Sequence, residues 1–128
     1  MPSTVYVHLT WTTHQRSPMI KGECAVFLGR FLPKAARRHG AMVIETGLVS
    51  DHVHLVLLLP PVFDIPRLVQ GLKGASARIA NRDYVAKRGE LRWASGYDLR
   101  SVSPRGLERV RQYVKNQHLK HPSSRLGA

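Results

Sequence analysis

The chain has very little cysteine, few acidic residues and no long hydrophobic run. Its one cysteine, Cys24, excludes a disulfide framework and a cysteine-based zinc site within one chain. No stretch approaches the roughly 18 apolar residues that a membrane-spanning helix needs, and the N-terminus lacks the pattern of a signal peptide. We therefore expect a cytoplasmic protein that does not enter a membrane.

The shortage of acidic residues leaves a large excess of positive charge. Twenty Lys and Arg stand against eight Asp and Glu, which gives a formal net charge of +12. The basic residues are spread along the chain, so we expect a folded surface to carry this charge. The excess favours a polyanionic partner, most simply nucleic acid, over a protein merely kept soluble by its charge. With 128 residues, 43% of them hydrophobic, residues 1–128 are expected to form one domain.

The most informative stretch is 50–59, S-D-H-V-H-L-V-L-L-L, which two prolines close. An apolar run of this length between turn residues predicts a strand buried on both faces, at the centre of a sheet. Side chains alternate along a strand, so His52 and His54 share one face, roughly 6–7 Å apart. Imidazole is a common metal ligand, but two core histidines bonded to backbone carbonyls would produce the same pattern.

The rest of the chain alternates between strand and helix patterns. Strands are expected over residues 4–13, 41–49 and 96–102, helices over 22–39, 65–82 and 105–118, and a charged loop over 82–89. Ser50 and Asp51 should join the second strand to the histidine strand as an antiparallel hairpin. Pro33 interrupts the first helical pattern, where a kink or a break is expected. His8, on the first strand, is expected to be structural or at the edge of a site.

The last predicted helix offers a third ligand for the histidine pair. Tyr113 and Gln117 stand four residues apart, so they lie together along one edge of this helix. A glutamine amide oxygen can complete a His-His-Gln site for a divalent ion, and Tyr113 would hold its phenol beside that ion. The other tyrosines lack a candidate ligand one helical turn away; they are Tyr6, Tyr84 and Tyr97.

Together these residues resemble the single-tyrosine HUH transposases of small insertion sequences (the IS-two-hundred type). The resemblance rests on His52 and His54 within S-D-H-V-H-L-V-L, and on Tyr113 and Gln117 as a Tyr-x-x-x-Gln helix motif. Further matches are the opening V-H-L-T-W-T-T, the segment L-V-Q-G-L-K-G-A-S-A-R, and Trp93 shortly before a Gly-Tyr pair. The matches cover nearly the whole chain in order and spacing.

The resemblance implies both a fold and an activity. The fold would be α+β and ferredoxin-like, with helices packed on an antiparallel sheet and a C-terminal helix carrying the tyrosine. A homodimer would cleave and rejoin single-stranded DNA at the hairpin-marked ends of a mobile element, in association with the nucleoid. His52, His54 and Gln117 would bind Mg²⁺ or Mn²⁺, and Tyr113 would form a 5′-phosphotyrosine. The tyrosine helix would cross to the histidines of the partner chain.

Four further residues are expected to contact DNA. Lys73 and Arg78 lie on the polar face of the second predicted helix, where phosphate contact and mere solvation would produce the same pattern. Trp93 offers a ring on which an exposed base could stack, as does Tyr97. Lys115 adds a cation to the tyrosine helix.

Other classes of protein explain less of the sequence. A histidine-triad nucleotide hydrolase also uses His-x-His on a strand, but it needs a third histidine where this chain has Val56. A non-catalytic ferredoxin-like module that binds single-stranded DNA or RNA would explain the charge and the fold. It would not explain why both histidines occur together with Tyr113 and Gln117. A domesticated transposase acting on repeated palindromes stays open.

Overall fold

The structure, a computed structural model, describes residues 5–84 and 90–118. In chain order its elements are β1 (Val5–Thr12), the 3-10 helix η1 (His14–Arg16), α1 (Gly22–Arg38), β2 (Met42–Val49), β3 (His52–Leu59), α2 (Ile65–Asp83), β4 (Asp98–Val102) and α3 (Leu107–Gln117). The four strands form one antiparallel sheet in the order β2-β3-β1-β4. This β-α-β-β-α-β arrangement confirms the predicted α+β, ferredoxin-like fold.

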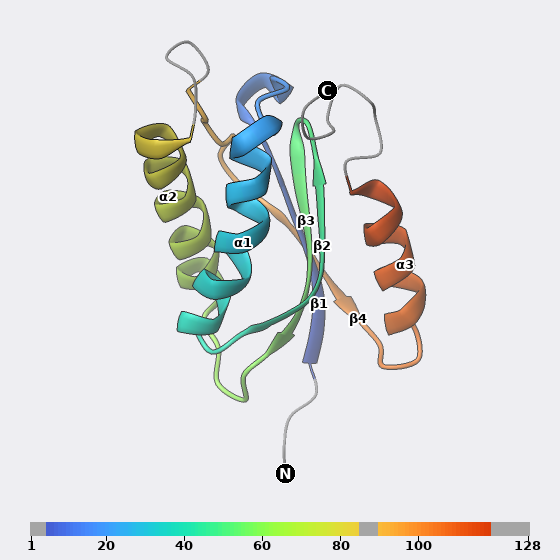
Figure 1. The fold of residues 1–128 in the computed structure, drawn as a ribbon. Helices are drawn as coiled ribbons and strands as arrows, with labels where there is room; N and C mark the ends of the chain where they lie inside the picture. Colours follow the sequence, from blue (N-terminus) through green and yellow to red (C-terminus); the bar gives the residue numbers. More distant parts are fainter. Residues whose placement is uncertain (1–4, 85–89, 119–128) are drawn as a thin grey trace.

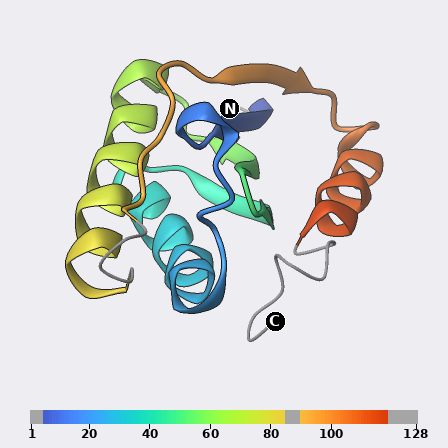
Figure 2. The same ribbon diagram turned by 90° about the horizontal axis from the view of Figure 1, so that it is seen from above.

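The two faces of the sheet are covered differently. Helices α1 and α2 lie side by side on one face, whereas α3 is the one helix of the described residues that lies on the other (Figures 1 and 2). The core fills the face beneath α1 and α2, and its largest fully buried side chains include Leu9, Trp11, Leu28, Leu32, Leu55, Leu57 and Leu72. No helix in the described part of the chain is long and apolar enough to cross a membrane.

The histidine strand is central, as its apolar run predicts. β3 pairs with β1 on one side and with β2 on the other. Ser50 and Asp51 form the turn between β2 and β3, so the predicted hairpin is also confirmed. Val53 and Leu55 are fully buried in the core, and alternation along the strand therefore turns His52 and His54 toward the face that α3 covers.

Of the kink or break expected at Pro33, the break is wrong. α1 is one continuous helix of 17 residues with this proline inside it. Proline costs an internal hydrogen bond, on the order of 3 kcal/mol in a helix. Burial of residues on both sides of it offsets this cost, because Leu28 and Leu32 precede it and Ala36 follows it, all fully buried.

Several element boundaries differ from the sequence prediction by one or two residues, among them the start of β4 and the end of α2. β4 begins at Asp98 rather than at residue 96. Gly96 has a φ of +86°, outside the strand region, and its carbonyl accepts a hydrogen bond from the Lys73 ammonium at 2.9 Å. The N–H of Ala94 still donates to the Thr12 carbonyl of β1 at 2.9 Å, so the turn at Gly96 interrupts the pairing with β1, which resumes at Asp98. α2 continues through Asp83, so it takes in the start of the expected charged loop, and residues 85–89 of that loop lie outside the described residues.

Candidate active site

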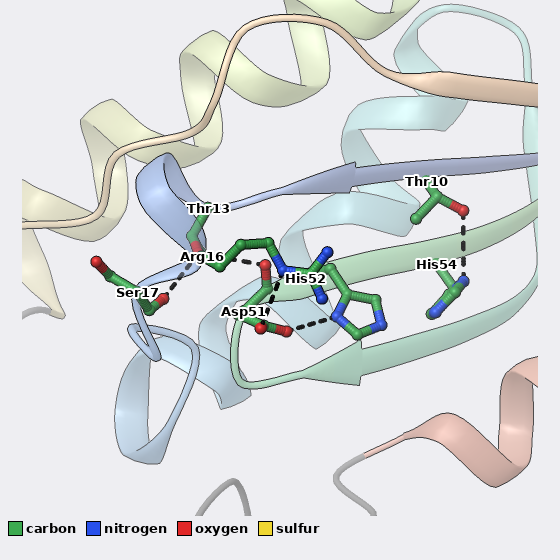
Figure 3. A network of polar contacts seen from close by, with 7 residues as sticks. All are labelled: Thr10, Thr13, Arg16, Ser17, Asp51, His52 and His54. Carbon is green, nitrogen blue, oxygen red and sulfur yellow. Dashed lines mark hydrogen bonds and ion pairs between the residues drawn. The ribbon is translucent and has the colours of Figure 1, made fainter.

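Two histidines occupy the face of β3 that α3 covers. The ring centroids of His52 and His54 lie 4.7 Å apart. His54 is only 6% exposed, whereas His52 is partly accessible. Figure 3 shows the two rings beside each other on β3, with polar partners arriving from the β2–β3 turn and from β1. The pair thus combines a buried imidazole with one that solvent can reach.

Each ring is held through its Nδ1 atom. The Nδ1 of His52 lies 2.6 Å from Oδ1 of Asp51, and the Nδ1 of His54 lies 2.9 Å from Nε2 of His8. Thr10 Oγ1 lies 3.4 Å from both the His8 and His54 nitrogens. Within the described residues, the buried Nε2 of His54 has no hydrogen-bond partner. An imidazole anchored through one nitrogen with the other left free is the usual arrangement of a metal-binding histidine.

Burial and nearby charges tune this cluster. Burial, helped by the proximity of His52 and His8, lowers the pKa of His54 to about 4. Burial also lowers the pKa of His8. Burial alone would raise the pKa of Asp51, but its hydrogen bond to His52 and the neighbouring Arg16 together lower it. Arg16 Nε donates to Asp51 at 3.2 Å (Figure 3). At neutral pH His54 is therefore uncharged, the form that can bind a metal ion.

This burial makes stability depend on pH. The pKa of His54 falls from 6.5 to about 4 on folding, so between these values the unfolded chain binds a proton that the folded chain does not. The free energy of unfolding should therefore decrease as the pH falls through this window. We expect His54→Gln to make the decrease shallower. Urea unfolding at a series of pH values in EDTA measures the slope, and an unchanged slope in the variant would contradict the assignment.

α3 brings the candidate nucleophile onto the histidines. The Tyr113 ring centroid lies 5.8 Å from that of His54 and 6.2 Å from that of His8, edge-on to both. Tyr113 is 51% exposed, so its ring is also open to solvent. Gln117 ends α3, one turn further on, and is half-buried. Among the described residues no hydrogen bond joins Gln117 to either histidine of β3.

Two of the expected DNA-binding residues are engaged in packing. The ammonium of Lys73 donates to the carbonyls of Ala94 and Gly96 at 2.7 and 2.9 Å. The indole N–H of Trp93 donates to the Lys73 carbonyl at 3.1 Å, and its ring meets Trp11 edge-to-face. Trp11 belongs to the core, on the sheet face away from the histidines. Both side chains therefore stabilise the segment before β4, and their contact with DNA stays a prediction.

The other two expected DNA-binding residues are exposed. Arg78 lies on α2, on the helical side of the sheet, whereas Lys115 lies on α3. Lys115 lines an open groove of about 660 Å³ along β2, together with Glu45 and His118. Of the four, only Lys115 shares an element with Tyr113.

Sequence reasoning underrated three partners of the histidines. His8, Thr10 and Asp51 make the contacts that orient the two rings. Alternation along β1 predicts from the sequence that His8 and Thr10 share a face. The sequence does not give the register between β1 and β3, in which Thr10 pairs with His54 and His8 therefore lies diagonally across from His54.

The fold and the site define a class: a ferredoxin-like domain whose central strand presents two histidines beneath a helix that carries a tyrosine. The chain belongs to the family described as "Transposase IS200 like", whose model matches residues 2–117. The family that the sequence resembles is thereby confirmed.

Individual relatives agree with this membership. The ISDra2 transposase TnpA of Deinococcus radiodurans is 34% identical over 115 residues, covering 87% of this chain and 82% of that protein. The transposase of insertion sequence IS200 from Salmonella typhimurium is 23% identical, covering 86% and 74%. A crystal structure of a Deinococcus radiodurans protein assigned as a transposase superposes with a TM-score of 0.72 at 31% identity, covering 91% and 92%.

A more distant solved structure shares the fold. The REP-associated tyrosine transposase bound to a REP hairpin superposes with a TM-score of 0.69 at 13% identity, covering 95% of this chain and 70% of that one.

Proposed function

We propose that this protein cleaves and rejoins single-stranded DNA at hairpin-marked ends, with Tyr113 as the nucleophile. The observation that carries the proposal is the Tyr113 ring against His54, whose buried Nε2 lacks a partner within the described chain. Family membership supports transposase chemistry, and the hairpin bound by the REP-associated relative supports hairpin DNA as a partner. A domesticated role on repeated palindromes would use the same residues.

The donor set fits a divalent ion such as Mg²⁺ or Mn²⁺. The unpartnered Nε2 of His54 is the sort of orphaned buried atom that a metal satisfies. No cluster of three His, Cys, Asp or Glu side chains suited to a metal occurs in residues 5–84 and 90–118. A site built on His52 and His54 would therefore need an amide oxygen, for which Gln117 is the candidate. Such an ion, when bound, supplies a Lewis acid that offsets charge developing on the scissile phosphate.

The proposed reaction retains the energy of the cleaved phosphodiester bond in a phosphotyrosine ester. The Tyr113 phenolic oxygen forms a bond to phosphorus, the bond from phosphorus to the 3′ oxygen breaks, and the phenolic proton is lost to solvent while the 3′ oxygen gains one. The products are a 5′-phosphotyrosine and a free 3′-hydroxyl. Attack by a 3′-hydroxyl on that ester reverses the step and restores Tyr113, so rejoining needs no nucleotide cofactor.

A covalent adduct is the direct test. The protein would be incubated with a panel of labelled single-stranded hairpin DNAs, some palindromic repeats and some with longer single-stranded flanks, in Mn²⁺ or in EDTA. We expect a labelled band on a denaturing gel at the combined mass of the protein and the attached DNA. This band should form only with Mn²⁺. No adduct with any hairpin would favour the non-catalytic binding module.

DNA affinity should depend strongly on salt. With a net charge of +12, binding releases counterions, and affinity should fall at least about tenfold between roughly 50 and 200 mM salt. Fluorescence anisotropy with a labelled hairpin measures this slope. Lys115→Ala and Arg78→Ala compare a cation on α3, the helix of Tyr113, with one on α2. Removing a side chain that binds a phosphate should reduce the slope by about one unit. A salt-independent affinity would contradict the nucleic-acid role.

We also propose that the working unit is a homodimer. Excision takes cuts at two ends, each cut occupies one tyrosine, and this chain offers one tyrosine beside the histidines. In this single chain Tyr113 lies against its own His54, and the family resemblance suggests that α3 crosses to the partner's histidines in the working dimer.

Mixing two inactive chains tests the crossing. A Tyr113→Phe chain would be combined with a chain in which both histidines are alanine. If sites are shared between chains, mixed dimers contain one complete site, and up to about a quarter of wild-type adduct formation returns. If each site is built within one chain, the mixture stays inactive, which would refute the crossing.

A further inference from the structure

α3 is held on the sheet by a small interface. The helix has 11 residues, of which Val114 is fully buried. Isolated helices of this length are marginal in water, so packing against the sheet keeps α3 folded as well as in place. Most of this packing is against the edge strand β2. The fit between α3 and β2 therefore decides where Tyr113 lies.

The two elements approach each other closely at Gly47. A Cβ atom on Gly47 would lie 2.5 Å from the backbone oxygen of Val114 and 2.9 Å from its Cγ1. Gly47 pairs directly with His54 across the sheet, and Val114 follows Tyr113 in α3. This close approach therefore lies beside both the histidine and the tyrosine of the candidate site.

Two polar contacts flank it. Arg111 Nη2 donates to Oε1 of Glu45 at 3.4 Å, and the backbone N–H of Leu48 donates to Nδ1 of His118 at 3.0 Å. Because β2 is an edge strand of the sheet that residues 5–84 and 90–118 form, no further strand in these ranges pairs with that amide, and His118 satisfies it. We call Gly47 and these two contacts the helix seat.

We propose that Gly47 is a positioning residue, whose missing side chain lets α3 come close enough to set Tyr113 against His54. This rests on the proposed role of Tyr113 as nucleophile; in the proposed dimer, the α3 that crosses over would pack on the same glycine of the chain that supplies the histidines. The backbone does not itself require glycine here, since Gly47 is not among the glycines with positive φ. Glycine weakens the interior of a strand, so the close approach of α3 is the remaining physical reason for it.

Gly47→Ala tests the proposal. The new Cβ would meet a backbone carbonyl that cannot rotate away, so α3 must move outward by roughly 1 Å, a displacement that can cost on the order of 100-fold in rate. We expect adduct formation at saturating hairpin DNA to fall by about that factor, with DNA affinity unchanged. Hydrogen exchange should quicken in α3 and stay unchanged in β3, which a general loss of stability would not produce.

Gly74→Ala is the matched control. Gly74 lies in α2, where a Cβ would meet nothing within 4 Å, so adduct formation and exchange in α3 should match the wild type. His118→Ala is a second test that does not depend on the folding of Gly47→Ala. It removes the acceptor for the Leu48 amide and should also quicken exchange in α3, with a smaller loss of rate.

The outcomes separate the two proposals. If Gly47→Ala changes neither hydrogen exchange in α3 nor the adduct rate, the role of the helix seat is refuted. The proposed function would still stand in that case, provided that Tyr113→Phe is inactive. An active Tyr113→Phe would instead overturn the proposed function. Faster exchange in α3 of Gly47→Ala would then still show that Gly47 holds the helix, and the link to catalysis would be refuted.

Discussion

Tyr113→Phe is expected to abolish the covalent protein–DNA adduct while hairpin binding stays near the wild-type level. The substitution removes one oxygen atom, the one proposed to attack phosphorus. The phenyl ring can keep its place against His54 and His8, whose ring centroids lie 5.8 and 6.2 Å away. Losing a nucleophile typically costs several orders of magnitude in rate, so we expect a fall of at least about 1,000-fold.

The measurement is the labelled adduct on a denaturing gel, with anisotropy for binding. Tyr97→Phe is a matched control, because Tyr97 is also exposed, at 42% against 51% for Tyr113, but precedes β4 rather than lying on α3. Tyr97→Phe should form the adduct at the wild-type rate. Were Tyr113→Phe to keep its adduct, mass spectrometry of the DNA-linked peptide would identify the true nucleophile and our assignment would fall.

Replacing both His52 and His54 by alanine should abolish cleavage and binding of Mn²⁺, and leave DNA binding largely intact. These rings supply the two nitrogens of the proposed site, and Gln117 alone would be a poor ligand set. Loss of an outer partner of a metal ligand typically costs 10–100-fold in affinity, so loss of two ligands should cost more than about 100-fold. Electron paramagnetic resonance of Mn²⁺ measures this independently of activity.

The histidine variant needs a control for folding. His54 is buried and bonded to His8, so its removal leaves a small cavity and an unpaired ring. Equal unfolding midpoints, or hairpin affinity close to the wild type, would show that the fold survives. His14→Ala, in the short η1 helix, should leave both cleavage and Mn²⁺ binding unchanged. Cleavage that survives the double substitution would rule out the metal assignment.

Local patterns predicted much of this protein because they follow from backbone geometry. The two-residue period of 52–59 placed both histidines on one face of a central strand, and helical spacing put Tyr113 one turn before Gln117. Where tertiary packing could override a local rule, prediction was poorer. α1 continues through Pro33, because the burial on both sides of it outweighs the missing hydrogen bond.

The roles of surface side chains were predicted least well from the sequence. A lysine and a tryptophan are residue types common on DNA-binding surfaces, but Lys73 and Trp93 are engaged within the fold. The Lys73 ammonium donates to the carbonyls of Ala94 and Gly96, and the Trp93 indole N–H donates to the Lys73 carbonyl. A polar helix face looks the same in sequence whether water, DNA or a loop covers it. Only the path of the chain before β4 distinguishes these cases.

By itself the sequence determined the net charge, the elements and the motif that identifies the family. The tertiary structure decided which distant residues meet. His8 and His54 are 46 residues apart, yet their ring nitrogens lie 2.9 Å apart because β1 and β3 are neighbours in the sheet. Gly47 meets Val114 because α3 returns to the edge strand. Alternation tells which face a side chain takes, but strand order, register and helix docking depend on contacts between segments far apart in the chain.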